Sequence, residues 1–556
     1  MKKQLYRGFV QLLFFIFNLQ RFVDCSICET CICAESGPAR VVNCRGKRLE
    51  GNNIFRFDLL MFDEEPRLAA LNLAENGLSV LPVDMFRNLN NLKVLNLSEN
   101  YIENIPDEAF DHLQSLEELD LSKNNLTTLT NRVLERVTNI ELLDLSSNRI
   151  SELDPAINLL TRLIHLDLSH NNLENLPNGS LKTLTELRHL DLSFNKIVSL
   201  GEDNLSHLNN LTSLLLNNNH LVYLSPHELP VSIEHLNVGY NMISAIPNTL
   251  VNLKILEVYY NEIRELDAET FGFSEIESLN ISGNKLTSYP DLKLKKLNVL
   301  DLSFNQLPTI PESISNENLP NLSLLVISGN PIRDLKFNSE LRLRSFVAQS
   351  LDLLENIDEG AFAKLGSPAA DECLNLTISK NEKLTFIQEN AFNDLNLCSL
   401  DLSSNNLMSV SPLIINSKNN LTKNYSIDLQ SNPFHCDCSL QWMLLELLPK
   451  LYTMNPELLE NLRCATPPNL KNRRMVHWYK WKEEVFCEDS QILVSKSSVQ
   501  TAGVMERNNG TIKIESSTGM LAALIGAAVV LSMLVAIGIV LARRIAVRRS
   551  RRNRRF

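Results

Sequence analysis

The 556-residue chain has few of the residues that mark fibrous or low-complexity proteins, with only 18 glycines and 21 prolines. This composition excludes a collagen-like or proline-rich repetitive architecture. The sequence also lacks the short motifs of common enzymes, since it contains no glycine-rich phosphate loop, no His-Glu-x-x-His segment and no Gly-x-Ser-x-Gly elbow. We therefore predict that the protein is not an enzyme and has no cofactor.

Positive charge is scarce except at the two ends of the chain. The formal net charge is −12, but residues 1–25 carry +3 and residues 543–556 carry +8, which leaves −23 for the residues between them. Such an acidic section cannot supply the clustered Lys and Arg that phosphate contacts need. The charge distribution thus argues against nucleic acid as a partner.

Each basic end adjoins an apolar segment. Residues 1–25 have a basic start, an apolar stretch from Phe9 to Phe17 and a short polar run, which is the layout of a secretory signal peptide. Residues 519–542 form a run of 24 residues without charge, long enough to cross about 30 Å of hydrocarbon, and arginines follow at once. The positive-inside rule then places residues 543–556 in the cytoplasm. The sequence predicts a single-pass type I protein of the plasma membrane with one transmembrane helix.

A short pattern recurs through most of the chain at a period of about 24 residues. The segment 71–76, Leu-Asn-Leu-Ala-Glu-Asn, returns at 95–100 as Leu-Asn-Leu-Ser-Glu-Asn, and about sixteen copies follow one another up to Ile427. Alternate leucines point to one face of a short strand, and the asparagine can satisfy backbone groups in the turn that follows. One repeat cannot bury its own apolar face, so neighbouring repeats must stack.

This pattern resembles the leucine-rich repeat. The resemblance implies an α/β solenoid, a leucine-rich repeat horseshoe with a parallel β-sheet on its concave side, over residues 51–434. Residues 26–50 and 435–487 resemble the cysteine-rich N- and C-terminal caps of extracellular members of the family, which cover the ends of the core. Residues 488–518 are polar, rich in Ser and without the repeat, and are expected to form a stalk.

Loss of Cys25 with the signal peptide leaves ten of the eleven cysteines, an even number suited to an oxidising compartment. The resemblance implies the pairs Cys28–Cys33 and Cys31–Cys44 in the first cap, and Cys436–Cys464 and Cys438–Cys487 in the second. Cys373 and Cys398 lie just before the strands of successive repeats, where a bridge is geometrically plausible. Redox chemistry or zinc at Cys28-x-x-Cys31, and a metal at His435-Cys-Asp-Cys438, are weaker alternatives, because the caps account for these thiols.

Eleven Asn-x-Ser/Thr sequons predict a heavily glycosylated ectodomain. They lie at Asn96, Asn125, Asn178, Asn204, Asn210, Asn280, Asn321, Asn375, Asn420, Asn424 and Asn509. A second polar set sits between the two leucines of several strands, at Asp120, Asp144, Asp167, Asp191, Asp301 and Asp401. This column would either bind cations or belong to the repeat scaffold, and we favour the scaffold because Leu-Asp-Leu-Ser resembles the family consensus.

The basic tail, residues 543–556, is too short to fold into a signalling domain, which argues against a Toll-type receptor with its own intracellular module. Its eight arginines would either bind anionic lipid of the inner leaflet, at about 1 kcal/mol each, or act only as a stop-transfer signal. Arg552-Asn553-Arg554 resembles an endoplasmic reticulum retention signal, which would make surface display conditional. Small residues four apart in the span (Ala522 and Gly526, Ser532 and Ala536) would allow packing into a homo-oligomer.

Residues that flank the strand leucines are expected to face solvent on the concave side. In the central repeats aromatic and histidine side chains gather there: His165, His170, His189, Phe194, His235, Tyr240, Tyr259, Tyr260 and, further on, Phe304. Aromatic residues are enriched at interface hot spots, so these residues predict a binding face for an extracellular or membrane protein. The alternative is that the rings merely pack along the sheet. Glycans at Asn96, Asn280 and Asn375 would screen both ends of this face.

Two functions remain open at this point. The first is a cell-surface glycoprotein that binds a protein partner through its concave face, in adhesion or recognition or as a co-receptor. The second is an accessory subunit that modulates a channel or receptor in the same membrane.

Overall fold

The computed structural model describes residues 26–487, apart from residues 38, 50–66, 202–203, 226, 247–249, 268–272, 370–371, 415–425, 479 and 481–484. The expected signal peptide, stalk, transmembrane segment and basic tail lie outside the described residues, as do the sequons at Asn420, Asn424 and Asn509. Within the described ranges, the structure contains no helix that is long and apolar enough to cross a membrane.

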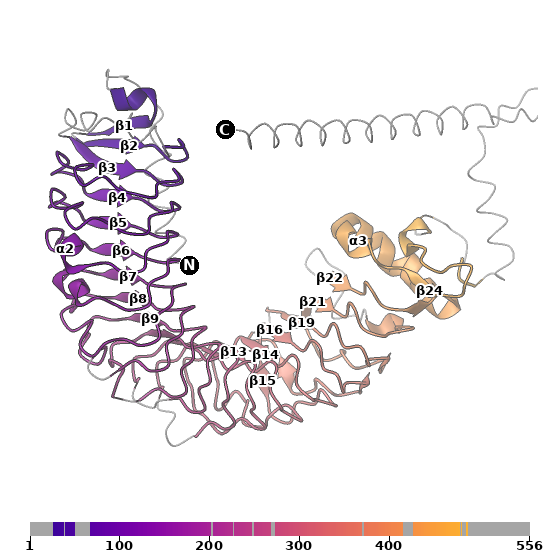
Figure 1. The fold of residues 1–556 in the computed structure, drawn as a ribbon. Helices are drawn as coiled ribbons and strands as arrows, with labels where there is room; N and C mark the ends of the chain where they lie inside the picture. The colour runs from indigo at the N-terminus through magenta and orange to yellow at the C-terminus, as the bar shows by residue number, and fades with distance from the viewer. Residues whose placement is uncertain are drawn as a thin grey trace, which may run out of the picture. The chain divides into compact units, whose positions relative to one another are not determined.

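One curved sheet of eighteen strands runs through the described chain (Figure 1). It starts with an antiparallel pair, β1 (Ile32–Ser36) and β2 (Ala39–Asn43), and from β2 onward each strand pairs in parallel with that of the next repeat. The repeat strands are β3 (Leu68–Asn72), β4 (Val94–Asn96), β5 (Glu118–Asp120), β6 (Leu142–Asp144), β7 (His165–Asp167), β8 (His189–Asp191), β9 (Ser213–Leu215), β10 (His235–Asn237), β11 (Ile255–Glu257), β12 (Ser278–Asn280), β13 (Val299–Asp301), β14 (Leu324–Val326), β16 (Ser345–Val347), β19 (Leu374–Thr377), β21 (Leu397–Asp401) and β22 (Ser426–Asp428).

Equivalent residues of successive repeats lie opposite one another in this sheet. Leu143 pairs with Leu166, and Leu166 with Leu190, and all three side chains are buried. Side chains alternate between the two faces of a strand, so the residues on either side of each buried leucine point to the concave side. The register therefore arranges the concave side chains in columns, with neighbours about 4.8 Å apart.

A buried asparagine closes the turn after each strand. The side-chain amide of Asn219 donates to the carbonyls of Leu192 and Leu216 at 2.9 and 3.0 Å, and its Oδ1 accepts the N–H of Ile197 at 2.9 Å. The same bond to the preceding repeat recurs along the chain, at Asn76, Asn100, Asn124, Asn148, Asn171, Asn195, Asn241, Asn261, Asn284, Asn305, Asn330, Asn381, Asn405 and Asn432. We call this series the asparagine ladder.

The ladder is interrupted at one repeat, where Leu351 stands in place of the asparagine. Leu351 is buried, and its N–H donates to Oδ1 of Asn381 in the following repeat at 2.8 Å. The preceding repeat is bonded in this turn through Gln349 instead, whose N–H donates to Oγ of Ser328 at 3.0 Å.

The convex side corrects the expected α/β solenoid, because it contains little α-helix. The described repeats return through turns and short helices, α2 (Asn131–Leu134), η4 (Pro155–Leu159) and η5 (Pro412–Ile414). Further along, two short strand pairs appear there: β15 (Leu341–Arg342) with β18 (Leu365–Gly366), and β17 (Asn356–Ile357) with β20 (Phe386–Ile387). A repeat of about 24 residues leaves too little chain, after a strand and two turns, for a helix of several turns. The fold is a β-solenoid of leucine-rich repeat type.

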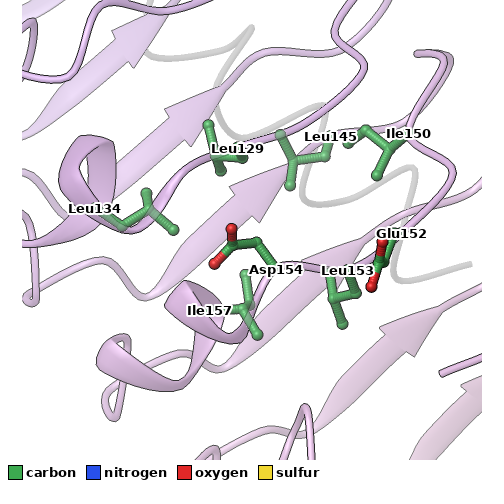
Figure 2. A pocket seen from close by; sticks show the side chains of 8 residues that line it. All are labelled: Leu129, Leu134, Leu145, Ile150, Glu152, Leu153, Asp154 and Ile157. Carbon is green, nitrogen blue, oxygen red and sulfur yellow. The ribbon is translucent and has the colours of Figure 1, made fainter. Parts of the chain in front are cut away.

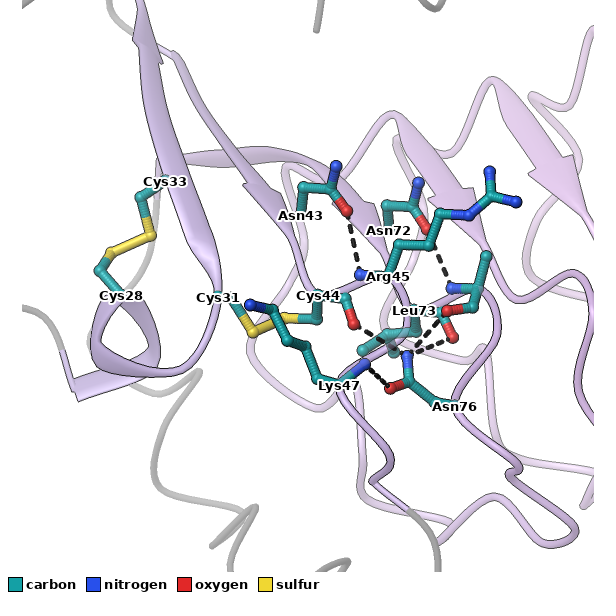
Figure 3. The surroundings of a disulfide bond; sticks show 11 residues. Cys28, Cys31, Cys33, Asn43, Cys44, Arg45, Lys47, Asn72, Leu73 and Asn76 are labelled. Carbon is teal, nitrogen blue, oxygen red and sulfur yellow. Dashed lines mark hydrogen bonds between the residues drawn. A yellow bond between two sulfur atoms is a disulfide. The ribbon is translucent and has the colours of Figure 1, made fainter. Parts of the chain in front are cut away.

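Disulfide-bonded caps close both ends of the described solenoid. In the first cap, Cys28–Cys33 joins η1 (Ser26–Glu29) to β1, and Cys31–Cys44 ties the chain to the end of β2 (Figure 3). In the second cap the pairs are Cys436–Cys464 and Cys438–Cys487, and Cys373–Cys398 joins two neighbouring repeats. The elements of the second cap are β23 (Phe434–His435), η6 (Cys438–Leu440), η7 (Met443–Leu447), α3 (Leu448–Met454), η8 (Pro456–Leu459), β24 (Cys464–Thr466) and η9 (Met475–His477). These are the five pairs expected from the sequence.

Candidate functional site

The strongest candidate site is a row of aromatic and histidine rings just after the C-terminal ends of strands in the central repeats. Each ring belongs to the residue just before a ladder asparagine, and we call this set the aromatic column: His170, Phe194, Tyr240, Tyr260 and Phe304. Phe194, Tyr240, Tyr260 and Phe304 are 43%, 47%, 43% and 51% exposed. Large side chains of this exposure can contact a partner directly.

The backbone under the aromatic column is left-handed, with φ between 51° and 56°. The same conformation recurs at this position in other repeats, for example at Glu75 and Lys123, so it is a property of the repeat, although it strains residues other than glycine and asparagine. Asn218, Gly283 and Gly329 occupy the same column in other repeats and show what the backbone itself prefers. The recurrence of Asn and Gly at this repeat position is also the signal from which its left-handed conformation could have been predicted.

The rings of the aromatic column are held in fixed positions. Tyr240 and Tyr260 stack with centroids 4.6 Å apart and planes at 9°, and His170 stacks on Phe194 at 4.1 Å. Tyr260 leans onto Gly283, where an added Cβ would lie 2.6 Å from the ring, and Phe304 leans onto Gly329 in the same way. The rings therefore pack along the sheet, as one of the two alternatives expects, while they remain partly exposed to solvent.

The predicted partner-binding residues form two groups. On β7 and β8, His165 lies opposite His189, with ring centroids 5.8 Å apart, beside the His170–Phe194 stack. On β10 and β11, Nε2 of His235 lies 3.1 Å from Oε2 of Glu257. Tyr259 there meets Tyr240 edge to face at 5.5 Å. Strand β9, with Ser213 and Asn218, separates the two groups.

The aspartate column has a structural role in the turns. Oδ1 of Asp144, Asp167 and Asp191 accepts the N–H of the serine two residues further on, at 2.9 to 3.0 Å. Burial, together with the carboxylates of Asp191 and Asp144 on either side, raises the pKa of Asp167 to about 6. Among the residues that the structure describes, no group of three or more His, Cys, Asp or Glu could hold a metal ion.

One small cavity lies on the convex side, between α2 and the turn that leads to η4 (Figure 2). Its volume is about 10 Å³, room for about one water molecule. Its lining is mostly aliphatic: Leu129, Leu134, Leu145, Ile150, Glu152, Leu153, Asp154 and Ile157. The cavity is too small for a metabolite and belongs to the packing of the repeats.

The structure also places the sequons. Asn96, Asn280 and Asn375 lie on repeat strands and are half-buried or exposed, as is Asn125 just after β5, while Asn178, Asn210 and Asn321 are exposed in the turns of the return segments. Asn204 is 0% exposed; its amide donates to the carbonyls of Leu176 and Leu200, and its Oδ1 accepts the N–H of Ser180. A glycan on Asn204 is incompatible with this packing, which corrects the expectation from the sequon alone.

Comparison with known proteins agrees with the fold. Residues 66–126, 99–150 and 158–221 match a family described as leucine rich repeat, as do residues 296–316, and residues 330–441 match the BspA type leucine rich repeat region. Fibromodulin of Oryctolagus cuniculus is 32% identical over 140 residues, which cover 24% of this chain and 91% of that relative. The chain belongs to the leucine-rich repeat family.

Two further relatives match over a similar length. Toll-like receptor 10 and osteomodulin, both of Bos taurus, are 33% and 36% identical over 138 residues, which cover 24% of this chain. The match spans 17% and 32% of those relatives' lengths.

Two solved structures have the same fold. A leucine-rich repeat protein of Leptospira interrogans has a TM-score of 0.51 and 27% identity, covering 66% of this chain and 86% of its own. Toll in the Toll–Spätzle complex of Drosophila has a TM-score of 0.51 at 21% identity, covering 76% and 62%, and shows the fold alone.

Proposed function

We propose that the protein is a cell-surface glycoprotein that binds a protein partner through the concave side of β7–β11. The aromatic column carries this proposal, because its large rings are substantially exposed in successive repeats. Other repeats have glycine, asparagine, serine, glutamate or lysine at this position, so the fold itself does not require an aromatic residue there.

The packing of the rings favours binding. Stacking against the neighbouring repeat restricts the side chains before a partner arrives, so less conformational entropy is lost on association. Tyrosine and phenylalanine bring large contact areas, and hot spots are enriched in aromatic residues. The histidines of β7, β8 and β10 add polar groups next to the rings.

The comparisons support the class of partner. Toll in the solved complex is a leucine-rich repeat protein bound to another protein, Spätzle. We extend this to the present chain as a proposal: the partner is an extracellular or membrane protein, and the protein acts in adhesion or recognition or as a co-receptor.

The membrane attachment is part of the same proposal. Residues 519–542 would anchor the protein in the plasma membrane, and residues 543–556 would contact anionic lipid at the inner leaflet. The disulfide-bonded caps support an extracellular location for the repeats, because such bonds persist in oxidising compartments.

The decisive experiment replaces three residues of the face, His189→Ala, Tyr240→Ala and Tyr260→Ala, after the partner has been identified by proximity labelling on intact cells. Loss of two or more hot spots predicts at least about 30-fold weaker partner binding at equal surface display. The control is Tyr101→Ala with Tyr223→Ala, since both tyrosines are exposed but lie outside the strand columns. If the triple variant keeps its affinity for the partner while the control variant loses it, the binding site lies elsewhere on the protein.

A second experiment separates adhesion from the accessory-subunit alternative. Two labelled cell populations that express the protein are mixed, with and without residues 543–556. Clustering that survives the deletion supports adhesion. Absence of clustering, with co-purification of a membrane protein that requires residues 519–542, supports the accessory subunit.

A further inference from the structure

A second hollow lies where the last repeat meets the C-terminal cap. It is an open depression of about 490 Å³, and we call it the cap hollow. Its lining residues are Asn406, Ser431, Asn432, Pro433, Asn461, Arg463, Cys464, Ala465 and Asn472. The lining thus contains one guanidinium, four side-chain amides, no carboxylate and no aromatic ring.

The backbone around the cap hollow is rigidly connected. The N–H of Ser431 donates to the carbonyl of Asn461, and the N–H of Asn472 donates to the carbonyl of Cys464 at 2.8 Å. The guanidinium of Arg463 donates to the carbonyl of Asn472 at 2.9 Å, and Cys464 is bonded to Cys436. These bonds hold the backbone of the hollow and the guanidinium of Arg463 in place without a ligand.

Three of the four amides have unused hydrogen-bonding capacity. Asn432 belongs to the asparagine ladder and uses its amide and its Oδ1 there. The side chains of Asn406, Asn461 and Asn472 are half-buried or exposed, and make no hydrogen bond to another residue in the described part of the chain. A side-chain amide offers a donor and an acceptor together, which suits the hydroxyl groups of a sugar.

Three more cations adjoin Asn472, a lining residue of the cap hollow, in the sequence. Lys471, Arg473 and Arg474 are exposed, and Arg474 pairs with Arg463 through an isolated antiparallel bridge. No ion pair joins any of these four cations to a carboxylate within the described ranges, and residues 463–474 contain no Asp or Glu. In a chain with a net charge of −12, these four cations without a paired carboxylate form a local positive patch, which attracts an anionic ligand.

We propose that the cap hollow binds a sulfated polysaccharide. The amides of Asn406, Asn461 and Asn472 contact sugar hydroxyls, while Arg463, Lys471, Arg473 and Arg474 contact sulfate groups through charge-assisted hydrogen bonds. The amides favour a sugar over a phospholipid surface, which offers few hydroxyls. The absence of an aromatic ring from the lining disfavours single-stranded nucleic acid, whose bases stack on such rings.

The test measures binding of labelled heparin, as the sulfated probe, to cells that display the full chain. The variant Lys471→Ala with Arg473→Ala and Arg474→Ala should bind heparin at least about tenfold more weakly, because exposed charges that pair with an anion are lost. The control is Lys93→Ala with Lys123→Ala and Lys254→Ala, which removes the same charge from cations already paired with Glu117, Glu99 and Glu234. This control should stay within about twofold of the unchanged protein, since exposed pairs of that kind contribute little.

A second variant separates the sugar from the charge. Asn406→Ala with Asn461→Ala should weaken heparin binding and leave binding of poly(vinyl sulfate), which carries sulfate but no sugar, unchanged. Heparin binding that survives the triple cation variant overturns the proposal. So does an amide variant that affects both probes equally or neither. Binding of phosphatidylserine vesicles that requires Lys471, Arg473 and Arg474, without heparin binding, would assign the cations to a membrane surface instead.

Discussion

Single residues of the aromatic column combine strain with exposure. A left-handed backbone costs a bulky residue about 1–2 kcal/mol, as at Tyr240 and Tyr260 with φ of 52° and 51°. A stacked ring pair returns about 0.5–1.5 kcal/mol, shared between the two residues. The stacking does not offset the strain at both positions, and Glu75 and Lys123 have the same backbone conformation. Partner binding is the reason that we propose for tyrosine at these positions.

Asp167 provides a test of the electrostatics at this scale. Its pKa is about 6 in the folded protein against 3.8 ordinarily, so the folded state holds the proton more tightly than the unfolded chain between pH 4 and 6. Stability therefore falls as the pH rises through this window, and the charged form disfavours folding at neutral pH by about 1–3 kcal/mol. We expect Asp167→Asn to raise the free energy of unfolding by this amount at pH 7.5 and by almost nothing at pH 4, measured by denaturant titration.

The comparison is made in a Ser169→Ala background, because Asp167→Asn alone creates a glycosylation sequon. Asn237 at the equivalent position of β10 still accepts the N–H of Gly239, so the amide can keep the turn bond. The matched control is Asp301→Asn with Ser303→Ala, compared with Ser303→Ala, since Asn280 and Val326 flank Asp301. An equal gain at both sites, or a gain that persists at pH 4, would contradict the role of the neighbouring carboxylates.

Asn204 gives a second test for a single residue. The buried amide bridges two repeats, so Asn204→Gln should destabilise the protein without changing its glycan mass. Each buried group left without its bond costs about 1–3 kcal/mol. Asn321→Gln, at an exposed sequon, should remove a glycan and leave the stability of the protein almost unchanged. Peptide mass spectrometry of the glycosites, with thermal unfolding of both variants, distinguishes these results, and an occupied Asn204 would refute the packing described.

At the scale of elements, the strands and the ladder followed from the sequence, whereas the convex side and the cap hollow did not. The strands were predictable because Leu-x-Leu repeats with period two and is followed by asparagine at constant spacing. Convex segments vary in length and carry no strict period, so the helix content inferred from the resemblance was wrong. Leu351 shows a similar limit, since the partner of its backbone N–H, Asn381, lies thirty residues further on in the next repeat. The cap hollow joins Asn406 to Asn472 across the cap fold, a proximity that no local pattern contains.

The asparagine ladder predicts that substitutions at two asparagines, one inside and one outside the ladder, differ in their effect on the free energy of unfolding. Asn219→Ala leaves the N–H of Ile197 and the carbonyl of Leu192 without this partner inside the solenoid, so we expect a loss of about 2–4 kcal/mol in the free energy of unfolding. Asn252→Ala removes one exposed bond to the carbonyl of Val231 and should cost less than about 1 kcal/mol. Denaturant titration of both purified variants measures the difference, and equal losses would argue against the ladder as a major source of stability.

The caps are the elements on which the ends of the solenoid depend. Cys464 is buried and bonded to Cys436, so Cys464→Ser removes a bridge worth about 2–5 kcal/mol and loosens the cover of the last repeat. We expect this variant to be retained inside the cell. Cys373 and Cys398 join two inner repeats that also pair through β19 and β21, so replacing both by serine should be milder. Surface staining measures the display of the two variants. Normal display of the Cys464 variant would contradict the prediction that the cap disulfide matters more than Cys373–Cys398.

At the scale of the whole solenoid, the sequons and the binding face occupy different places. The strand sequons Asn96 and Asn280 lie on β4 and β12, and the two groups of predicted contact residues lie on β7–β8 and β10–β11 between them. Glycans there would leave the strands between them accessible. Four members of the aromatic column, His170, Phe194, Tyr240 and Tyr260, thus lie in the region that these glycans would leave open, whereas Phe304 follows β13, beyond Asn280.

This arrangement predicts that a new glycan in the open region blocks the partner. Asp144→Asn creates Asn-Leu-Ser on β6, the same tripeptide that occurs at Asn96 on β4, and Asp144 is half-buried like Asn96. We expect the variant to be displayed, to gain one glycan and to lose partner binding at least tenfold. Adding Ser146→Ala removes the sequon but keeps the new amide, so binding should return. Thr183→Asn adds a sequon in a return segment of a nearby repeat and should leave binding unchanged. If an occupied glycan at position 144 leaves the affinity intact while the one at position 183 abolishes it, the partner binds outside the concave face.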